Sequence, residues 1–178
     1  MQEKITDKQI LELFRRDPEK GFRDLVQKYQ KRLYFHIRRI VILHEDADDA
    51  LQNSFIKIWQ NLSGFREASS LYTWLYRIST NEALSIINKR VQANEINLDS
   101  IFSSSVEGDL WFDGDLAEKK LWEAITSLPE KQRIVFIMKY YDDLKYKEIS
   151  SILETTVGAL KASYHHAVKK IEEYIGSH

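Results

Sequence analysis

The sequence contains no cysteine, two prolines and six glycines in 178 residues. The lack of cysteine excludes disulfide bonds and thiolate metal sites, and it fits a reducing compartment. Few prolines and glycines favour long helices joined by short turns. No stretch approaches the roughly 18 apolar residues of a membrane span, and the N-terminus lacks the apolar core of a signal peptide. We therefore expect an all-α, cytoplasmic protein without direct membrane insertion.

Charge is unevenly distributed along a chain whose formal net charge is −1. Residues 1–92 carry a net charge of +4, residues 93–118 of −7, and residues 119–178 of +2. The middle stretch has clustered Ser, Asp and Gly and no helical period, which is typical of a linker. We expect two small helical domains, 1–92 and 119–178, joined by this acidic linker. Its apolar residues are expected to dock on the domains or on a partner: Ile101, Phe102, Leu110, Trp111 and Phe112.

Four helix starts are predicted in the first domain, each followed by apolar residues at three- or four-residue spacing. Thr6 to Gln9 has the form of a capping box. Pro18 after Asp17 begins a second helix, and Asp46 or Asp48 is expected to cap a third. A break at Ser63-Gly64-Phe65 precedes a long helix over 71–90, capped by Ser69 or Ser70.

The helix expected over 71–90 has an aromatic stripe beside its core face. Tyr72 and Tyr76 lie one turn apart, and the next face carries Thr73, Arg77 and Asn81. Aromatic rings beside Arg and Asn are suited to stacking on unpaired bases and to holding phosphates. From spacing alone, an ordinary amphipathic helix with tyrosines at its margin is the simpler interpretation.

The second domain ends in two short helices joined by a tight turn, the pattern of a helix-turn-helix. A capping box at Ser127-Leu128-Pro129-Glu130 begins the helix that precedes them. The pair itself has apolar positions around Ile149 to Leu153 and from Leu160 to Ile171, with the turn at 154–156.

The second helix of this pair is expected to turn a polar face outward. Thr155 and Thr156 are candidate caps, and the helix N-terminus can meet a phosphate. Lys161 and His165 are suited to base edges or phosphates. A solvated face is the alternative, and the two-helix context favours DNA. Adjacent side chains at His165 and His166 diverge, so a metal site is disfavoured, and we expect no cofactor and no catalytic constellation.

Five motifs in this order resemble a bacterial RNA polymerase sigma factor of the sigma-70 family, extracytoplasmic-function (ECF) group. They are "DADDALQNSFIKIWQ", Phe65, "TWLYRISTNEAL", "LPEKQRIVFIMKYYDDLKYKEIS" and "VGALKASYHHAVKKI". The resemblance covers nearly the whole chain and implies a protein that directs promoter recognition, promoter melting and transcription initiation, and that is not an enzyme.

The resemblance also implies residue roles. Contacts to core RNA polymerase are expected from Asp48, Asp49, Gln52, Phe55 and Trp59. Contacts to the unpaired minus-ten promoter strand are expected from Phe65, Arg66, Ser69, Tyr72, Thr73, Tyr76, Arg77, Asn81, Lys89 and Arg90. Contacts to the minus-thirty-five element are expected from Thr155, Thr156, Lys161, Ala162, Ser163, His165, His166 and Lys169.

The resemblance further implies an anti-sigma factor as a partner, often membrane-tethered in this family, and a linker that runs through the polymerase near its active centre. Three positions depart from the family pattern. Lys145 stands where Ser or Thr often caps a helix, which costs about 1 kcal/mol if nothing replaces the cap. Glu154 stands where Gly is common and predicts a strained left-handed residue. Ser163 and His166 replace common arginines of the reading helix, which leaves the preferred DNA sequence open.

Two other classes of function are less consistent with the sequence. A two-domain regulator that binds duplex DNA and a ligand is the alternative, and an enzyme is disfavoured because no ligand or catalytic cluster is present. The near-zero net charge predicts that the isolated chain binds duplex DNA weakly, because each phosphate contact requires a neutralising cation.

Overall fold

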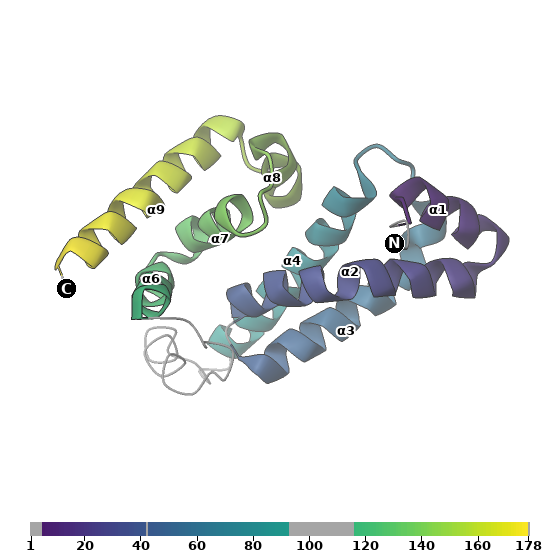
Figure 1. The fold of residues 1–178 in the computed structure, drawn as a ribbon, viewed down its shortest axis with the longest axis horizontal. Helices are drawn as coiled ribbons and strands as arrows, with labels where there is room; N and C mark the ends of the chain where they lie inside the picture. The colour runs from purple at the N-terminus through teal and green to yellow at the C-terminus, as the bar shows by residue number, and fades with distance from the viewer. Residues whose placement is uncertain (1–4, 42, 93–115, 178) are drawn as a thin grey trace.

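A computed structural model describes residues 5–41, 43–92 and 116–177, and all its regular elements in these ranges are helices (Figure 1). The all-α prediction is confirmed. The apolar residues that we expected to dock from the linker lie outside the described residues.

The N-terminal half is a bundle of helices α1 (Asp7–Arg16), α2 (Pro18–Val41), α3 (His44–Asn61) and α4 (Leu71–Gln92). The long helices α2, α3 and α4 pack against one another in all three pairs, and α1 packs on α2 (Figure 1). A short 3-10 turn, η1 (Leu62–Gly64), follows α3 where the sequence predicted a break. Helices α3 and α4 are therefore neighbours in this half.

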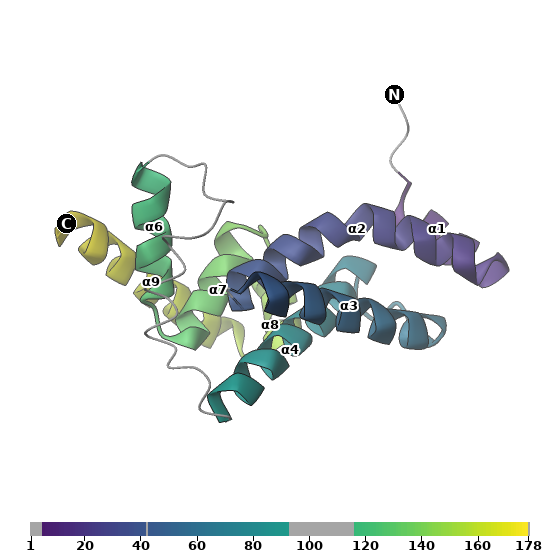
Figure 2. The same ribbon diagram turned by 90° about the horizontal axis from the view of Figure 1, so that it is seen from below.

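The C-terminal half contains α6 (Leu116–Thr126), α7 (Glu130–Tyr140), α8 (Tyr146–Leu153) and α9 (Val157–Ser177). Helix α9 packs on α6, α7 and α8, and Figure 2 shows α6 crossing it at a steep angle. Helical structure thus begins at Leu116, inside the stretch that we assigned to the linker.

Three of the predicted helix starts in the N-terminal half are confirmed by their hydrogen bonds. Thr6 Oγ1 accepts from the Gln9 N–H at 3.3 Å, and the Gln9 side chain accepts from the Thr6 N–H at 2.8 Å. Asp17 Oδ1 accepts from the Lys20 N–H at 3.1 Å. Ser70 Oγ accepts from the Thr73 N–H at 3.1 Å, so Ser70 rather than Ser69 caps α4.

Two predicted caps are wrong. Helix α3 begins at His44 after Leu43, without a side-chain cap, and Asp46 lies inside its first turn. Helix α7 begins after Pro129, again without a side-chain cap, and Ser127 Oγ instead donates to the Ala124 carbonyl at 2.8 Å. Helix α3 thus begins before the polar residue that the pattern selected, and α7 begins after it.

Gly21 sets the close approach of α1 and α2. A Cβ at this position would overlap the backbone of Phe14, so only glycine lets the two helices touch here. The contact seats Ile10 and Leu25, both fully buried, in the core of the N-terminal half. This packing fixes the angle of α1 at one end of the molecule (Figure 1).

The two halves share hydrophobic contacts. Leu75 of α4 and Ile149 of α8, both fully buried, belong to one continuous apolar cluster. Ile37 of α2 and Ile137 of α7 belong to a second cluster that also spans the halves. In this structure the halves are therefore packed together through α4 with α8 and α2 with α7.

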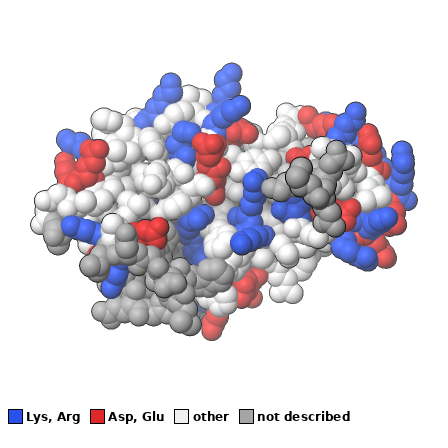
Figure 3. Space-filling model, in the orientation of Figure 1, with Lys and Arg blue, Asp and Glu red and all other residues white. Residues whose placement is uncertain are grey.

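Surface charge is mixed. On the face shown in Figure 3, basic and acidic side chains are interspersed over both halves rather than gathered in one basic patch. Within the described ranges, no helix is long and apolar enough to cross a membrane.

Candidate nucleic-acid interface

The aromatic stripe of α4 is built as the sequence predicted, but it is more buried than a solvent-facing margin. The rings of Tyr72 and Tyr76 lie 4.4 Å apart, and Tyr76 is only 2% exposed. Thr73 is also buried, whereas Arg77 and Asn81 are exposed. The three predicted faces of α4 are therefore present. Another part of the chain covers Tyr72, Thr73 and Tyr76.

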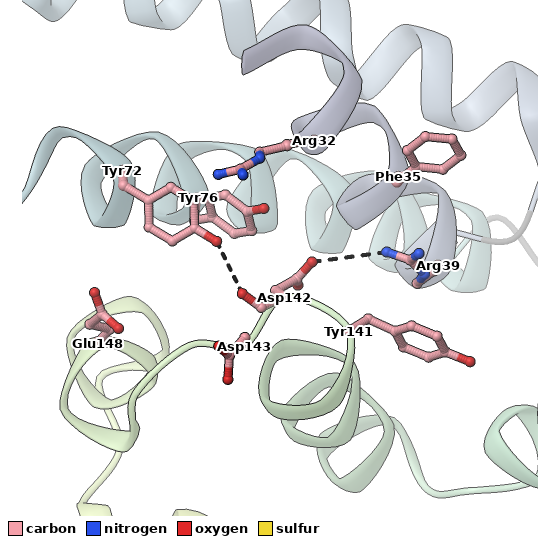
Figure 4. Close-up of a pocket in the computed structure, with 9 residues that line it drawn as sticks. All are labelled: Arg32, Phe35, Arg39, Tyr72, Tyr76, Tyr141, Asp142, Asp143 and Glu148. Carbon is pink, nitrogen blue, oxygen red and sulfur yellow. Dashed lines mark hydrogen bonds and ion pairs between the residues drawn. The ribbon is translucent and has the colours of Figure 1, made fainter. Parts of the chain in front are cut away.

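The C-terminal half covers this part of α4. The Tyr72 hydroxyl donates to the Asp142 carbonyl at 3.2 Å, and Thr73 Oγ1 donates to Glu148 Oε1 at 3.5 Å. One turn further along α4, the Arg77 guanidinium forms an ion pair with Glu154. Residues expected to contact DNA thus contact the C-terminal half instead (Figure 4).

A pocket of about 610 Å³ lies at this seam. Its wall combines two arginines and four aromatic rings with three carboxylates, so its charge is close to balanced. Figure 4 shows α2 and α4 above the acidic turn that follows α7. The lining residues are Arg32, Phe35, Arg39, Tyr72, Tyr76, Tyr141, Asp142, Asp143 and Glu148.

Burial changes the acidity of the two tyrosines. Burial, followed by the negative charge of Asp142, raises the pKa of the Tyr76 phenol above its ordinary value. Burial likewise raises the pKa of Tyr72. Both phenols are therefore neutral at physiological pH and act as aromatic surfaces and hydrogen-bond donors.

The loop between η1 and α4 positions the remaining N-terminal candidates. Phe65 packs on Trp74 of α4 with ring centroids 5.2 Å apart and is half-buried. Arg66 is exposed, and the Ser69 hydroxyl donates weakly to the Ser70 carbonyl at 3.4 Å. Glu67 has a left-handed backbone (φ 55°) and pairs with Arg15 at 2.9 Å. The loop is thus held against both α1 and α4.

The C-terminal end of α4 separates the last two minus-ten candidates. Lys89 is exposed, whereas Arg90 is held by Asp46 of α3 at 2.6 Å. Asp46 is 5% exposed, and its burial raises the pKa of its carboxyl while Arg90 opposes that rise. Arg90 therefore has a structural role in joining α3 to α4, which the sequence analysis missed.

Helix α3 presents the candidates for polymerase contact on its outer surface. Asp48, Asp49 and Gln52 are exposed, and Phe55 is half-buried. Trp59 is 41% exposed, with its ring edge-on to Phe14 and Phe22. An acidic stretch thus runs toward an accessible aromatic ring.

Helices α8 and α9 form the predicted helix-turn-helix. Glu154 adopts the left-handed conformation (φ 52°, ψ 38°) that the sequence predicted for the turn. Thr156 Oγ1 accepts from the Ala159 N–H at 3.3 Å and caps α9. The predicted capping role of Thr155 is wrong, because its hydroxyl donates back to the Leu153 carbonyl. Lys145 supplies no side-chain acceptor, but its N–H donates to Glu148 Oε2 at 2.8 Å.

The outer face of α9 carries the minus-thirty-five candidates. Leu160, Ala167 and Ile171 are buried on the opposite face, and Ser163 and Tyr164 are half-buried. The exposed candidates on the helix are Lys161, Ala162, His165, His166 and Lys169. This face remains open in the same structure in which α4 is covered.

Metal binding finds no geometric support in the described part of the chain, where no group of three or more His, Asp or Glu side chains is arranged to hold an ion. The rings of His165 and His166 lie 6.0 Å apart and are tilted by 57°.

Four residues at the seam were missed by the sequence analysis: His36, Arg39, Asp142 and Glu148. His36 is completely buried, its Nδ1 lies 2.7 Å from Asp142 Oδ2, and its Nε2 lies 2.8 Å from Thr80 Oγ1. The Arg39 guanidinium lies over the Tyr141 ring at 4.3 Å. No local pattern signals these contacts, because His36 and Asp142 are 106 positions apart.

Two family models match the chain in the same order as these surfaces. The model described as "Sigma-70 region 2" matches residues 25–92, and the one described as "Sigma-70, region 4" matches residues 118–171. The first range contains α3 and α4, and the second contains the helix-turn-helix.

Similar proteins cover the whole chain. The ECF RNA polymerase sigma-E factors of Salmonella typhimurium and of Escherichia coli strain K12 are each 29% identical over 189 residues, which is 98% of this chain and 97% of theirs. The sigma-E factor of Haemophilus influenzae is 29% identical over 186 residues, with 98% of both chains covered.

Solved structures share the fold. The sigma factor RpoE, in complex with the anti-sigma factor NepR from Bartonella quintana, matches with a TM-score of 0.74 at 24% identity and covers 88% of this chain and 98% of that one. CnrH, in complex with the cytosolic domain of CnrY, matches with a TM-score of 0.71 at 19% identity and covers 96% and 97%. With both sigma-70 regions in order and ECF factors matched over their full length, the chain belongs to the ECF group of the sigma-70 family, the sigma factors that direct promoter-specific transcription initiation.

Proposed function

We propose that this sigma factor divides its work among three surfaces: α3 for core RNA polymerase, α4 with its preceding loop for the minus-ten strand, and α9 for the minus-thirty-five element. The observation that carries the proposal is that α3 and α9 expose most of their candidate residues, and that these helices lie within residues 25–92 and 118–171, which the sigma-70 models match. Sigma factors are not enzymes, and each surface acts by binding alone.

Docking on the polymerase uses the exposed side of α3. Asp48, Asp49 and Gln52 supply polar and negative contacts, and Trp59 supplies an aromatic anchor beside them. Arginine-rich or lysine-rich partner surfaces complement such a face, and an exposed tryptophan at its edge is the residue type that dominates many interfaces.

Promoter melting uses α4 and the loop at 65–70. Capturing an unpaired base compensates the few kcal/mol lost when that base leaves the stack. Tyr72 and Phe65 offer aromatic surfaces for this purpose, and Arg77 and Arg66 offer charges for the backbone. Phe65 packs on Trp74 of α4, the helix that also carries Tyr72 and Arg77, which supports a joint role of the loop and α4 in strand capture.

Duplex reading uses α9. Its N-terminal N–H groups and Lys161 suit phosphates, and His165 suits a base edge in the major groove. The interspersed charges of the surface support only weak duplex binding by the chain alone, so the polymerase supplies much of the affinity (Figure 3).

The domain limits are part of the proposal: 1–92 for the polymerase and minus-ten surfaces, 93–118 for an acidic linker that runs near the polymerase active centre, and 119–178 for the upstream element. We place the protein in the cytoplasm, where its promoter DNA and polymerase lie. The matched RpoE structure contains a sigma factor bound to an anti-sigma factor, which supports an anti-sigma partner here as well.

A transcription assay with purified components tests this function. Core RNA polymerase and genomic DNA fragments are incubated with and without the protein, and the 5′ ends of the transcripts are mapped. We expect initiation at a small set of new sites only when the protein is present. Nanomolar binding of promoter duplex by the free chain, without any gain in initiation, would contradict the proposal and favour a simple duplex-binding regulator.

A further inference from the structure

The turn after α7 places a buried carboxylate against the N-terminal half. The Asp142 side chain is 4% exposed, its Oδ2 lies 2.7 Å from His36 Nδ1 on α2, and its Oδ1 lies 3.9 Å from Arg39. Its backbone carbonyl accepts from Tyr72 of α4 (Figure 4). One residue of the C-terminal half thus contacts two helices of the N-terminal half.

The hydrogen bonds around His36 define its charge. Thr80 Oγ1 uses its single proton to donate to the Tyr76 carbonyl at 2.7 Å, so it must accept from His36 Nε2–H. The Asp142 carboxylate must accept from His36 Nδ1–H. With both ring nitrogens donating, the imidazole is a cation, and Asp142 with His36 forms a buried charge pair between the halves.

Two carboxylates of the C-terminal half reach the neighbouring face of α4. Glu148 of α8 accepts from Thr73, and Glu154 of the turn pairs with Arg77. All three carboxylate-bearing residues are on the C-terminal half, and the α4 residues that they contact are candidates for the minus-ten strand. Polar groups of the C-terminal half therefore occupy the side chains of Tyr72, Thr73 and Arg77 that strand capture would use.

We propose that Asp142 and His36 form an interdomain latch, which keeps the chain closed and denies α4 to single-stranded DNA until the halves separate. The inference rests on the proposed role of α4 in strand capture. The latch covers one DNA-binding surface only, because the outer face of α9 is exposed in the closed chain. Closure thus covers Tyr72, Thr73 and Tyr76 of the melting surface and leaves the outer face of α9 open.

Removing the carboxylate opens the latch for a defined reason. In Asp142→Ala, the closed form buries the His36 cation without its partner, a state that proteins tolerate poorly. The open form lets water solvate that cation, so the equilibrium moves toward it. Asp142→Asn keeps the size and one acceptor oxygen of the side chain, and it provides a milder variant if the alanine variant folds incompletely.

The adjacent residue provides a matched control. Asp143 lies in the same turn, its side chain is 98% exposed, and its ion-pair partner is Lys139 of its own half at 3.8 Å. Asp143→Ala and Asp143→Asn remove the same charge from the same turn without removing a contact to His36.

The absence of native cysteine makes the distance measurement direct. Gln30→Cys on α2 and Lys170→Cys on α9, both at exposed positions, take spin labels on the full chain. We expect one narrow distance distribution in the parent and in the Asp143 variants, and a shift to longer distances in Asp142→Ala, with a smaller shift in Asp142→Asn. An unchanged distribution in Asp142→Ala would overturn the latch whatever the DNA measurements give.

Strand access is measured on the same variants with a fluorescent 20-nucleotide single-stranded DNA pool of random sequence. Apparent affinity scales with the fraction of competent molecules, so opening a chain that is about 90% closed strengthens binding about tenfold. We expect that gain in Asp142→Ala, and its loss when Arg77→Ala is added.

Two outcomes separate this inference from the proposed function. Longer distances without any gain in strand binding would overturn the blocking of α4, and they would also remove α4 from the proposed function. Failure of the transcription assay, with the distance shift and the strand-binding gain both present, would count against the proposed function while the latch stands.

Discussion

Asp142 Oδ2 lies 2.7 Å from His36 Nδ1, across 106 positions of sequence and inside a contact from which solvent is excluded. The pair joins the turn after α7 to α2, and its geometry determines where the protons lie. Because Thr80 accepts from the Nε2–H and the Asp142 carboxylate accepts from the Nδ1–H, both ring nitrogens act as donors in the closed chain.

We predict that both nitrogens of His36 carry protons and donate hydrogen bonds in the closed chain. Long-range proton–nitrogen correlation NMR on the full chain checks this, and with five histidines in the sequence the His36 signal is assigned by its loss in His36→Gln. A nitrogen shift typical of an unprotonated ring nitrogen would show that Asp142 and His36 do not form a charge pair.

Asp49→Arg is expected to weaken association with core polymerase by about tenfold, because it reverses a charge at the centre of the exposed α3 surface. Binding titrations with labelled protein measure the effect. Glu12→Arg, an equal charge reversal at an exposed position of α1, is expected to bind as the parent does. Equal affinities for the two variants would exclude α3 from the docking surface.

His165→Ala is expected to relax the preference at one base pair of the upstream element while polymerase binding stays intact. A lost base-edge contact is worth about 1–3 kcal/mol of discrimination. Initiation from a library of randomised upstream elements measures it, with Glu172→Ala, an exposed site two turns further along α9, as the control. If the selected sequences were identical for both variants, the reading face would have to be reassigned.

Gly21→Ala is expected to destabilise the fold by about 1–3 kcal/mol, because the new methyl group overlaps the Phe14 backbone and forces α1 away from α2. Gly158→Ala is the matched control, since nothing lies within 4 Å of its Cβ position and alanine gains up to about 1 kcal/mol in a helix. Urea unfolding compares the two. A parent-like stability of Gly21→Ala would refute the close contact.

Stability at alkaline pH is expected to depend on Tyr29, whose hydroxyl donates to Asp7 Oδ1 at 2.6 Å. Burial, and then this hydrogen bond, raises the pKa of Tyr29 above its unfolded value. The folded chain therefore retains a proton that the unfolded chain releases, and this contribution to stability is complete below about pH 10 and falls as the pH rises further.

The Tyr29→Phe variant isolates this contribution. It is expected to be less stable than the parent at pH 8 by about 1 kcal/mol, the net value of one hydrogen bond. Above pH 10 the parent loses up to about 1.4 kcal/mol per pH unit more than the variant, so their unfolding free energies converge. Parallel stability curves would contradict the assignment.

Local chemistry made several elements predictable from sequence. Thr6, Asp17 and Ser70 cap helices through bonds to residues three positions away, and Glu154 takes the left-handed turn that the helix-turn-helix pattern requires. The start of helix α3 was not predictable in this way, because its N-cap residue, Leu43, makes no side-chain hydrogen bond to the helix.

Long-range contacts account for what the sequence could not predict at the candidate site. Arg90 is a residue type that often binds a DNA strand. Here its guanidinium instead donates to Asp46 Oδ1 at 2.6 Å, and Asp46 lies 44 positions earlier in the sequence. The position of Tyr76 in the sequence predicts a residue at the edge of the apolar face of α4. The packing of the two halves buries it instead. The sequence pattern around Arg90 and Tyr76 predicts neither contact, because each contact depends on how separate helices pack and not on the local sequence.

The accessibility of α3 in the closed chain has a kinetic consequence. Asp48, Asp49 and Trp59 are exposed to solvent. The C-terminal half covers Tyr72 and Tyr76. Assembly with the polymerase can thus begin before the halves separate, as a bimolecular encounter whose rate grows with concentration. Separation then follows as a first-order rearrangement, so stopped-flow traces should reach a plateau rate that added polymerase cannot raise.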